Sequence, residues 1–188
     1  SGKSTRIRRL LKELEPSKGR IYINGQDLKK VTHKKIPMYR RNVGVVFQNF
    51  RLLPDRNVYD TVAFAMKVVE SSNREIKKKV PMMLSLVGLA AKYRSRPSQL
   101  SGGEQQRVAI ARALVVDAEV VVMDEPITNL DAKLREEMLL EIRMIQKNLG
   151  ATILYITHDQ QSALQLCDRM AIMESDGRLC QVGTDEEI

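Results

Sequence analysis

One stretch of the sequence, residues 99–131, constrains the fold of this chain more than any other. A Ser-Gly-Gly sequence at residues 101–103 predicts a tight turn, and the apolar spacing after it predicts an amphipathic helix. An apolar, β-branched run at residues 120–123 then delivers two carboxylates, Asp124 and Glu125, to the end of a buried strand. Glycines let a backbone approach a ligand closely, and helix N-termini attract anions. The stretch therefore predicts an anion site followed by an acidic site.

Three motifs in this stretch resemble those of the ATP-binding-cassette (ABC) ATPases. Residues 100–107 (L-S-G-G-E-Q-Q-R) resemble the signature, residues 120–126 (V-V-V-M-D-E-P) the Walker B strand, and residues 129–131 (N-L-D) the D-loop. The motifs occur in the family's order, whereas S-G-G or D-E alone would carry little weight. The resemblance implies an α/β fold of the P-loop NTPase kind, with a mainly parallel sheet covered by helices and an inserted helical subdomain.

The first residues match the second half of the phosphate-loop pattern G-x-x-x-x-G-K-[ST]. In this pattern Lys3 reaches the β- and γ-phosphates of ATP, Ser4 places its hydroxyl on Mg²⁺, and backbone amides such as that of Gly2 cradle the phosphates. By resemblance, Thr5 lies near the α-phosphate. Because the first half of the pattern is absent, we expect the chain to be a fragment of a longer protein and to bind ATP more weakly than the restored protein.

Apolar periodicity and turn residues predict the other elements. Strands are predicted over residues 20–23, 42–47, 151–156, 168–173 and 178–182, turns at residues 24–25 and 176–177, and helices over residues 6–14, 58–69, 74–87 and 131–149. Strands alternating with helices favour a parallel sheet whose ligand-binding residues lie at the C-terminal ends of its strands. We expect one ABC ATPase domain over residues 1–188, with a helical subdomain at residues 49–98 inserted in a core of residues 1–48 and 99–188.

The resemblance assigns roles to four residues that follow or end predicted strands. Asp124 would hold Mg²⁺, and Glu125 would polarise the water that attacks the γ-phosphate. His158, after the next strand, resembles the switch histidine that bridges the γ-phosphate and the catalytic carboxylate. Gln48, in the sequence V-F-Q-N, resembles the Q-loop glutamine, which contacts Mg²⁺ or the attacking water. Phosphoryl transfer needs what these residues would supply, namely neutralised phosphate charge and a positioned water.

The same resemblance implies a dimer with two composite ATP sites. Ser101, Gly102 and Gly103 of one subunit would close over ATP bound by the other. Asp131 of the D-loop would lie at the interface, and the second subunit would be an identical copy or a paralogous ATPase. ATP binding would drive closure, and the loop that contains Gln48 would transmit this motion to a membrane partner.

Two parts of the chain resemble different ABC subfamilies. Residues 50–66 are similar to the bacterial cell-division ABC ATPase that pairs with a membrane protein. Residues 129–138, 156–160 and 181–188 are similar to the ATPases of sugar or polyamine importers. Our first interpretation is the ATP-hydrolysing subunit of an importer, bound to a transmembrane permease on the cytoplasmic face of the membrane. The alternative is a cell-division ATPase that regulates a division membrane protein rather than transporting a substrate.

Charge and composition narrow the kinds of partner that this protein could bind. The net charge of +8 would suit nucleic acid or an anionic membrane surface, but the basic residues are scattered and are not interleaved with aromatic residues that could stack on bases. We therefore expect solvated charge and no direct nucleic-acid partner, and we rank a soluble ABC ATPase acting on nucleic acid or ribosomes last. Cys167 and Cys180 lack metal-ligand spacing, which favours cytosolic thiols. No apolar run reaches the roughly 18 residues that span a bilayer, so a membrane role would need a partner.

Overall fold

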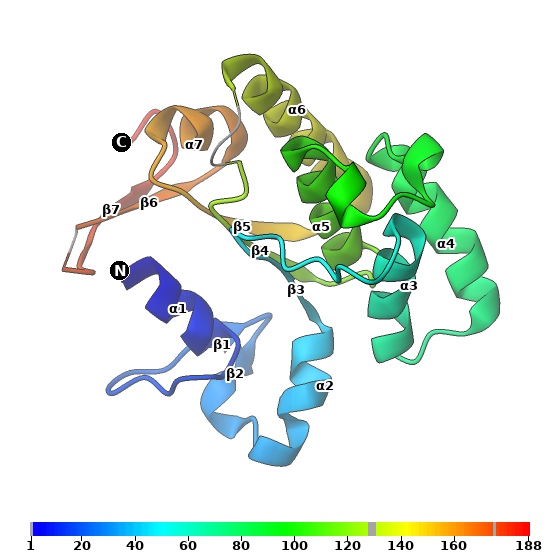
Figure 1. Cartoon of the computed structure of the whole chain (residues 1–188). Helices are drawn as coiled ribbons and strands as arrows, with labels where there is room; N and C mark the ends of the chain where they lie inside the picture. The colour runs from blue at the N-terminus through cyan, green and yellow to red at the C-terminus, as the bar shows by residue number, and fades with distance from the viewer. Residues whose placement is uncertain (1, 128–130, 175) are drawn as a thin grey trace.

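A three-stranded parallel sheet lies at the centre of the molecule (Figure 1). The computed structural model describes residues 2–127, 131–174 and 176–188. The strands of the sheet are β3 (Val43–Val46), β4 (Val120–Asp124) and β5 (Thr152–Ile156), paired in that order and all parallel. Valine dominates β3 and β4, because β-branched side chains pack well in strands that are covered on both faces. The C-terminal ends of the three strands therefore meet at one edge of the sheet.

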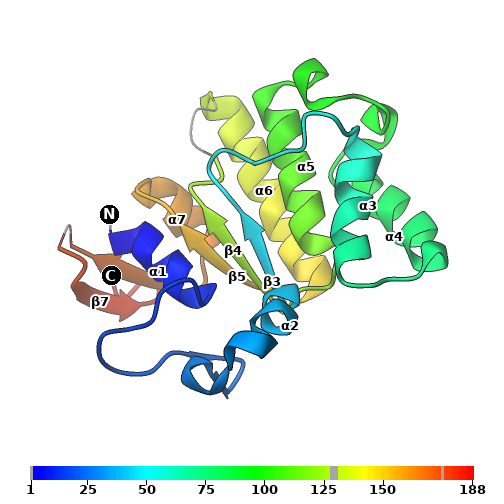
Figure 2. The same ribbon diagram turned by 60° about the horizontal axis from the view of Figure 1, so that its bottom comes forward.

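Different helices cover the two faces of this sheet. Side chains alternate along a strand, so Val121 and Met123 of β4 enter one apolar core, whereas Val122 enters another. The first core contains residues of α5 (Gly102–Leu114) and α6 (Ala132–Leu149), and the second contains residues of α1 (Gly2–Leu10). Figure 2 shows α1 on one side of the sheet and α5 with α6 on the other. The predicted α/β fold with a parallel sheet covered by helices is confirmed.

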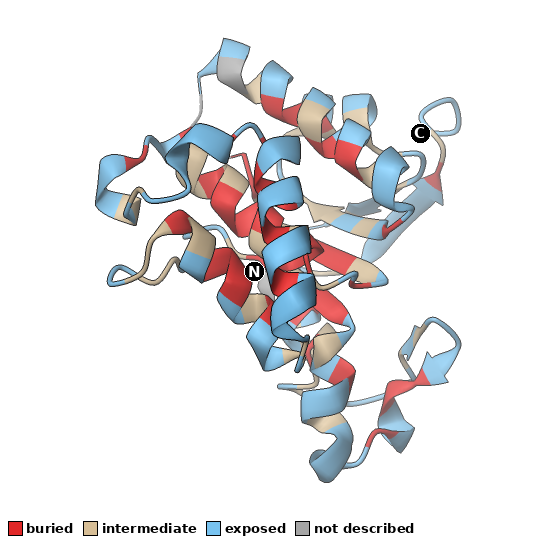
Figure 3. Cartoon of the chain, turned by 90° about the vertical axis from the view of Figure 1, so that its right-hand side faces the viewer, coloured by how far each residue is buried: buried red, intermediate tan, exposed pale blue. Residues whose placement is uncertain are grey.

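A pair of helices, α3 (Val58–Val68) and α4 (Asn73–Leu86), packs against α5 within the first core. Asn57 caps α3 by accepting a hydrogen bond from the Asp60 amide at 2.7 Å, and Ser72 forms a capping box with Glu75 at the start of α4. Figure 3 shows the helices with buried residues on one side and exposed residues on the other. The helices predicted over residues 58–69 and 74–87 are confirmed, while their treatment as an inserted subdomain stays a prediction.

Two antiparallel hairpins lie outside the central sheet. β1 (Tyr22–Ile23) and β2 (Gln26–Asp27) are joined by Asn24 and Gly25, whose φ angles of 48° and 74° form the left-handed turn that Asn-Gly sequences favour. β6 (Met170–Met173) pairs with β7 (Leu179–Gly183) in the second hairpin. The turn at residues 24–25 is therefore confirmed. The strand predicted over residues 20–23 is shorter than expected, and β2 was not predicted.

The helix predicted over residues 6–14 is displaced toward the N-terminus, because α1 ends at Leu10. Its C-terminus is a Schellman motif, in which the Glu13 amide donates to the Arg8 carbonyl at 2.8 Å and the Lys12 amide donates to the Arg9 carbonyl at 3.0 Å. Lys12 takes the left-handed conformation, with a φ of 58°, that such an ending requires. The apolar residues after Leu10 keep a helical spacing, so periodicity alone could not locate this ending.

Several short helices also differ from the prediction. Those that were not predicted are α2 (Ile36–Arg41), α7 (Gln160–Leu166) and the 3₁₀ turns η1 (Leu28–Lys30), η2 (His33–Lys35), η3 (Ala90–Lys92) and η4 (Pro97–Gln99). α2 and α7 bury one residue each, Tyr39 and Ser162, so they leave little periodic signal in the sequence. Cys167 and Cys180 are free thiols. None of the helices within the described ranges combines the length and apolarity needed to cross a bilayer.

Candidate functional site

The carboxyl edge of the parallel sheet holds the acidic pair. Asp124 is the last residue of β4 and is the register partner of Ile156 on β5. Glu125 follows with a left-handed backbone, at a φ of 49°, and its amide donates to the Ile156 carbonyl at 2.9 Å. This conformation is uncommon outside glycine and costs free energy unless the surroundings hold it. The hydrogen bond to β5 therefore fixes the backbone that carries the Glu125 carboxylate.

The Glu125 carboxylate contacts two residues that follow β5. Its Oε2 lies 2.9 Å from Nδ1 of His158, and the Thr157 hydroxyl donates a longer hydrogen bond of 3.4 Å to the same oxygen. An imidazole has a second ring nitrogen, Nε2, besides the one that faces Glu125. The Glu125 side chain is 14% exposed, whereas that of His158 is 73% exposed. The edge thus combines a shielded carboxylate with an imidazole that a ligand can reach.

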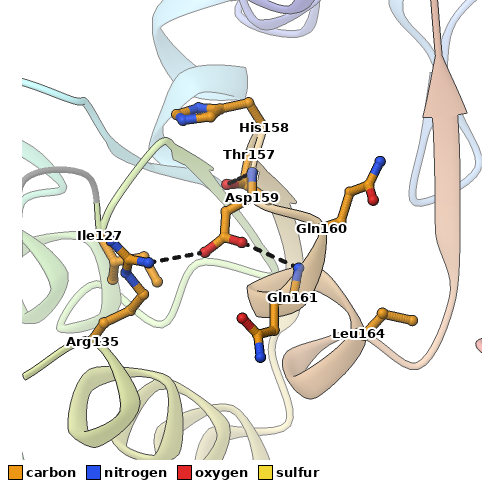
Figure 4. A pocket seen from close by; sticks show the side chains of 8 residues that line it. All are labelled: Ile127, Arg135, Thr157, His158, Asp159, Gln160, Gln161 and Leu164. Atoms are coloured by element: carbon orange, nitrogen blue, oxygen red, sulfur yellow. Dashed lines mark hydrogen bonds and ion pairs between the residues drawn. The ribbon is translucent and has the colours of Figure 1, made fainter. Parts of the chain in front are cut away.

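Asp159 anchors the chain that follows β5 (Figure 4). Its carboxylate caps α7 through the Gln161 amide at 3.2 Å and accepts a hydrogen bond from the Ser162 hydroxyl at 2.5 Å. Arg135 of α6 lies 3.6 Å from the same carboxylate, and the Asp159 amide donates to the Thr157 hydroxyl at 3.0 Å. The hydrogen bond from Ser162 is the main cause of the lowered pKa of Asp159. Sequence reasoning missed this cluster, although an aspartate before a helix is an ordinary N-cap signal.

A pocket of about 590 Å³ opens beside this cluster and is lined by Arg135, Asp159, Ile127, Gln160 and Leu164 among others. Figure 4 shows the His158 ring directed away from the Asp159 carboxylate. The two neighbouring side chains therefore have different partners: His158 contacts Glu125, and Asp159 contacts Arg135. Through these contacts the segment after β5 is joined both to the end of β4 and to α6.

The predicted phosphate-binding residues, 2–5, form the first turn of α1, where helix amides attract anions. The other end of this helix is held by Tyr39, whose hydroxyl donates to the Leu10 carbonyl at 2.5 Å. Burial raises the pKa of Tyr39 to about 12, so this hydroxyl stays a donor at neutral pH. The side chains of Lys3 and Ser4 lie outside the described part of the structure, and their roles stay predictions.

Gln48 leaves the sheet at the same edge, two residues after β3. It is exposed and begins a turn in which the Phe50 amide donates to the Phe47 carbonyl at 2.9 Å. β3 runs parallel to β4, so the chain after β3 emerges at the edge that also holds Asp124 and His158. The structure brings the ends of three strands together as the sequence predicted, while the chemical role of each residue stays a prediction.

The predicted tight turn at residues 101–103 is wrong. Ser101 is the N-cap of α5, and Gly102 and Gly103 are its first helical residues. The Ser101 hydroxyl accepts from the Glu104 amide at 3.3 Å, and the Ser101 amide donates to Glu104 Oε2 at 2.8 Å, which lowers the pKa of Glu104. Serine with glutamate three residues later is a capping box, and this signal indicates a helix start rather than a turn. Within one chain these residues stand apart from α1, because α5 covers the opposite face of the sheet (Figure 2).

Asp131 lies immediately before α6, where its carbonyl accepts a hydrogen bond from the Arg135 amide at 2.9 Å. It is exposed, as a residue at a subunit interface would be in the separate chain. The rest of the predicted D-loop, Asn129 and Leu130, lies outside the described residues, as does Thr128. The placement of Asp131 in a dimer interface therefore stays a prediction.

The predicted Mg²⁺ ligands are Asp124, Ser4 and Gln48, which offer one carboxylate and two neutral oxygens. Within the described ranges, no three His, Cys, Asp or Glu side chains are grouped so that they could hold a metal ion by themselves. Magnesium in nucleotide sites is usually bound through one or two carboxylates, with water and phosphate oxygens as its other ligands. This set of oxygen ligands would suit a magnesium ion that is bound together with a nucleotide, and its placement stays a prediction.

Comparison with known proteins identifies the family. The model of the ABC transporter family matches residues 1–128, so the chain belongs to the ABC transporter family, as its motifs predicted. The solved structure of cbiO1 from Clostridium perfringens, part of the ABC transporter complex cbiONQ, matches with a TM-score of 0.90 at 32% identity. The match covers 98% of this chain and 73% of that chain, and it confirms the P-loop NTPase fold class.

Curated relatives match along the whole chain. The spermidine/putrescine import ATP-binding protein PotA of Acidothermus cellulolyticus is 44% identical over 187 residues, which is 100% of this chain and 47% of that protein. The Fe(3+) ions import ATP-binding protein FbpC of Rhizobium etli is 42% identical over 187 residues, or 51% of that protein. The chain thus spans about half the length of these relatives. The resemblance of residues 50–66 to a cell-division ATPase stays a prediction.

Proposed function

We propose that this chain is the ATP-binding and ATP-hydrolysing part of a subunit that powers an ABC importer. Membership of the ABC transporter family and similarity to import ATP-binding proteins support this proposal. The single observation that carries the chemistry is the contact of 2.9 Å between Glu125 Oε2 and His158 Nδ1. It lies at the carboxyl edge of a parallel sheet, where α/β folds of this kind bind their ligands.

In this proposal the start of α1 binds the phosphates of ATP. The amides of its first turn donate to phosphate oxygens, and Lys3 offsets their negative charge. Asp124, together with Ser4 and Gln48, would hold Mg²⁺, which would neutralise further phosphate charge. Binding would therefore draw on a helix N-terminus and on the end of the middle strand.

Hydrolysis then depends on Glu125. Its carboxylate accepts a hydrogen bond from a water molecule and turns the water's lone pair toward the γ-phosphate. His158 contacts the carboxylate through Nδ1, and in this proposal its Nε2 binds the γ-phosphate. The low exposure of Glu125, 14%, strengthens these contacts because less water screens them.

Replacing the carboxylate with an amide of the same shape tests this assignment. In the protein that carries this chain, Glu125→Gln should lower the rate of ATP hydrolysis by about 100-fold or more, because general-base catalysis contributes roughly 10²- to 10⁴-fold. ATP binding should be retained. Glu186→Gln is the matched control, since its side chain is exposed and far along the chain from the site, and it should hydrolyse ATP at the wild-type rate. Wild-type hydrolysis by Glu125→Gln would reject the assignment.

The proposal extends to a dimer on the cytoplasmic face of a membrane. α1 and α5 cover opposite faces of the sheet, which favours a site completed by the Ser101 end of α5 from a second subunit, identical or paralogous. A transmembrane permease is the proposed membrane partner. Glu125→Gln with saturating ATP should sediment as a particle of two ATPase subunits. A monomer under these conditions would argue against the composite site.

A second candidate function rests on residues 50–66, which resemble the cell-division ABC ATPase. In that case the chain would regulate a division membrane protein rather than power transport. The two candidates differ in the partner that stimulates hydrolysis. Stimulation by a co-reconstituted permease supports the importer, whereas stimulation by a division membrane protein supports the second candidate. Neither candidate includes a direct nucleic-acid partner.

A further inference from the structure

A partly buried cation on α5 belongs to none of the predicted motif roles. Arg112, on α5, donates from Nη1 to the Arg51 carbonyl and from Nη2 to the Phe50 carbonyl, both at 2.8 Å. Partial burial lowers the pKa of Arg112. Moving part of a charged group out of water costs free energy, and hydrogen bonds to that group offset the cost. The hydrogen bonds to the two carbonyls therefore replace the water that the Arg112 guanidinium loses.

The two carbonyls belong to a strained turn. Phe50 and Arg51 have φ angles of 53° and 46°, so two successive residues other than glycine lie in the left-handed region. Each such residue costs free energy, and the conformation persists only where neighbouring groups hold it. A planar guanidinium with five N–H donors can reach both carbonyls at once, whereas an ammonium is a single point of charge. An arginine at position 112 is therefore better suited than a lysine to bind both carbonyls of the turn.

Phe50 and Arg51 belong to the same turn as Gln48, at residues 48–51. Two contacts join the residue before Gln48 to this turn: the Arg51 guanidinium lies 4.0 Å from the centre of the Phe47 ring, and the Phe50 amide donates to the Phe47 carbonyl at 2.9 Å. The residues around Gln48 are therefore tied to each other and, through Arg112, to α5. Figure 2 shows the segment after β3 passing beside α5 before it reaches α3. A shift of α5 would move this turn with it.

We propose that Arg112 is a positioning residue that holds the turn at residues 48–51 against α5 and so keeps Gln48 at the carboxyl edge of the sheet. The inference rests on the proposed function, in which Gln48 takes part in ATP hydrolysis. It adds a mechanical link, because α5 begins at Ser101 and contacts the Gln48 turn through Arg112 near its other end. If a second subunit closed on Ser101 and moved α5, Gln48 would then move as well.

Hydrogen exchange tests the physical half of the inference. In Arg112→Met the amides of Phe50 and Arg51 should exchange about 10- to 100-fold faster than in wild type, because the turn loses the contacts that hold it. Amides in the middle of α5 should keep their wild-type rates. Arg112→Lys, which keeps the charge, should lie between the two, and Arg74→Met, on an exposed part of α4, should match wild type. Unchanged exchange at Phe50 and Arg51 in Arg112→Met overturns the inference.

A double-mutant cycle tests the functional half. Arg112→Met should lower kcat for ATP hydrolysis about tenfold with an unchanged KM for ATP, since misplacing a positioned group by a fraction of an ångström has effects of this order. Arg112→Lys should restore part of the rate. The variant that combines Gln48→Ala with Arg112→Met should be no slower than Gln48→Ala alone. If the decreases in kcat caused by the two single substitutions multiply in the combined variant, the positioning role of Arg112 is rejected.

The two halves separate the inference from the proposed function. If Gln48→Ala alone leaves kcat unchanged, the role of Gln48 in hydrolysis is rejected, and the functional half of the inference is rejected with it. The exchange rates of Phe50 and Arg51 still decide whether Arg112 holds the turn. If Glu125→Gln hydrolyses ATP normally, the proposed function fails, whatever the exchange data show.

Discussion

Replacing Gly44 with alanine should destabilise the protein by about 1–3 kcal/mol, the usual cost of overfilling a packed core. A Cβ atom at Gly44 of β3 would lie 2.6 Å from the Ala113 carbonyl oxygen of α5 and 3.3 Å from Cγ2 of Val121 on β4. Ordinary contacts of this kind begin at 3.4 Å, so the strand or the end of the helix must move by about 0.8 Å (3.4 minus 2.6). Neither is free to do so cheaply, because the nearest atom belongs to the backbone.

The effect is large enough to measure by thermal and urea unfolding. For a domain of this size, 1 kcal/mol corresponds to roughly 2–4 °C in Tm, so a cost of about 2 kcal/mol predicts a loss of about 4–8 °C. Gly102→Ala is the matched control for stability, since a Cβ there meets no heavy atom within 4 Å and alanine suits a helix. It should be as stable as wild type or slightly more stable. A wild-type Tm for Gly44→Ala would refute the close approach of α5 to β3.

Two further predictions concern single side chains, and each has its own measurement. Ser72→Ala removes the capping box of α4 and should lower the free energy of unfolding by about 1 kcal/mol in urea, whereas Ser85→Ala, exposed later in the same helix, should change it little. Equal effects of the two variants would contradict the capping role. The hydrogen bond from Ser162, with a smaller contribution from Arg135, holds the pKa of Asp159 below its ordinary value of 3.8. A depressed pKa stabilises the fold at higher pH, so the advantage of wild type over Asp159→Asn should be present at pH 7 and should shrink as the pH falls below about 3.8. An advantage that does not change with pH would exclude ionised Asp159 as its source.

Much of the fold could be predicted from the sequence, because strong local patterns agree with the tertiary packing. The valine runs of β3 and β4 are buried on both faces, and the helices at residues 58–69 and 74–87 carry a clear apolar stripe. The errors arise where the deciding contact is a hydrogen bond that leaves no apolar pattern. The Schellman ending at Lys12 and the capping box at Ser101 are of this kind.

The candidate site could be predicted only as a set of strand ends. The sequence placed Gln48, Glu125 and His158 after three strands, and the parallel pairing brings those ends to one edge. It could not predict the left-handed backbone of Glu125, because that conformation depends on a hydrogen bond to Ile156, far along the chain. The hydrogen bonds from Arg112 to the turn could not be predicted for the same reason, since their acceptors are 61 and 62 residues away along the chain.

The central claim is that Glu125 and His158 act as one unit in ATP hydrolysis, and a double-mutant cycle of hydrolysis rates tests it most directly. The side chains meet at 2.9 Å, so removing either one disturbs the same group. The account predicts that His158→Ala lowers the rate and that the variant with both His158→Ala and Glu125→Gln is no slower than Glu125→Gln alone. Effects that multiply in the double variant, or wild-type hydrolysis by His158→Ala, would contradict it.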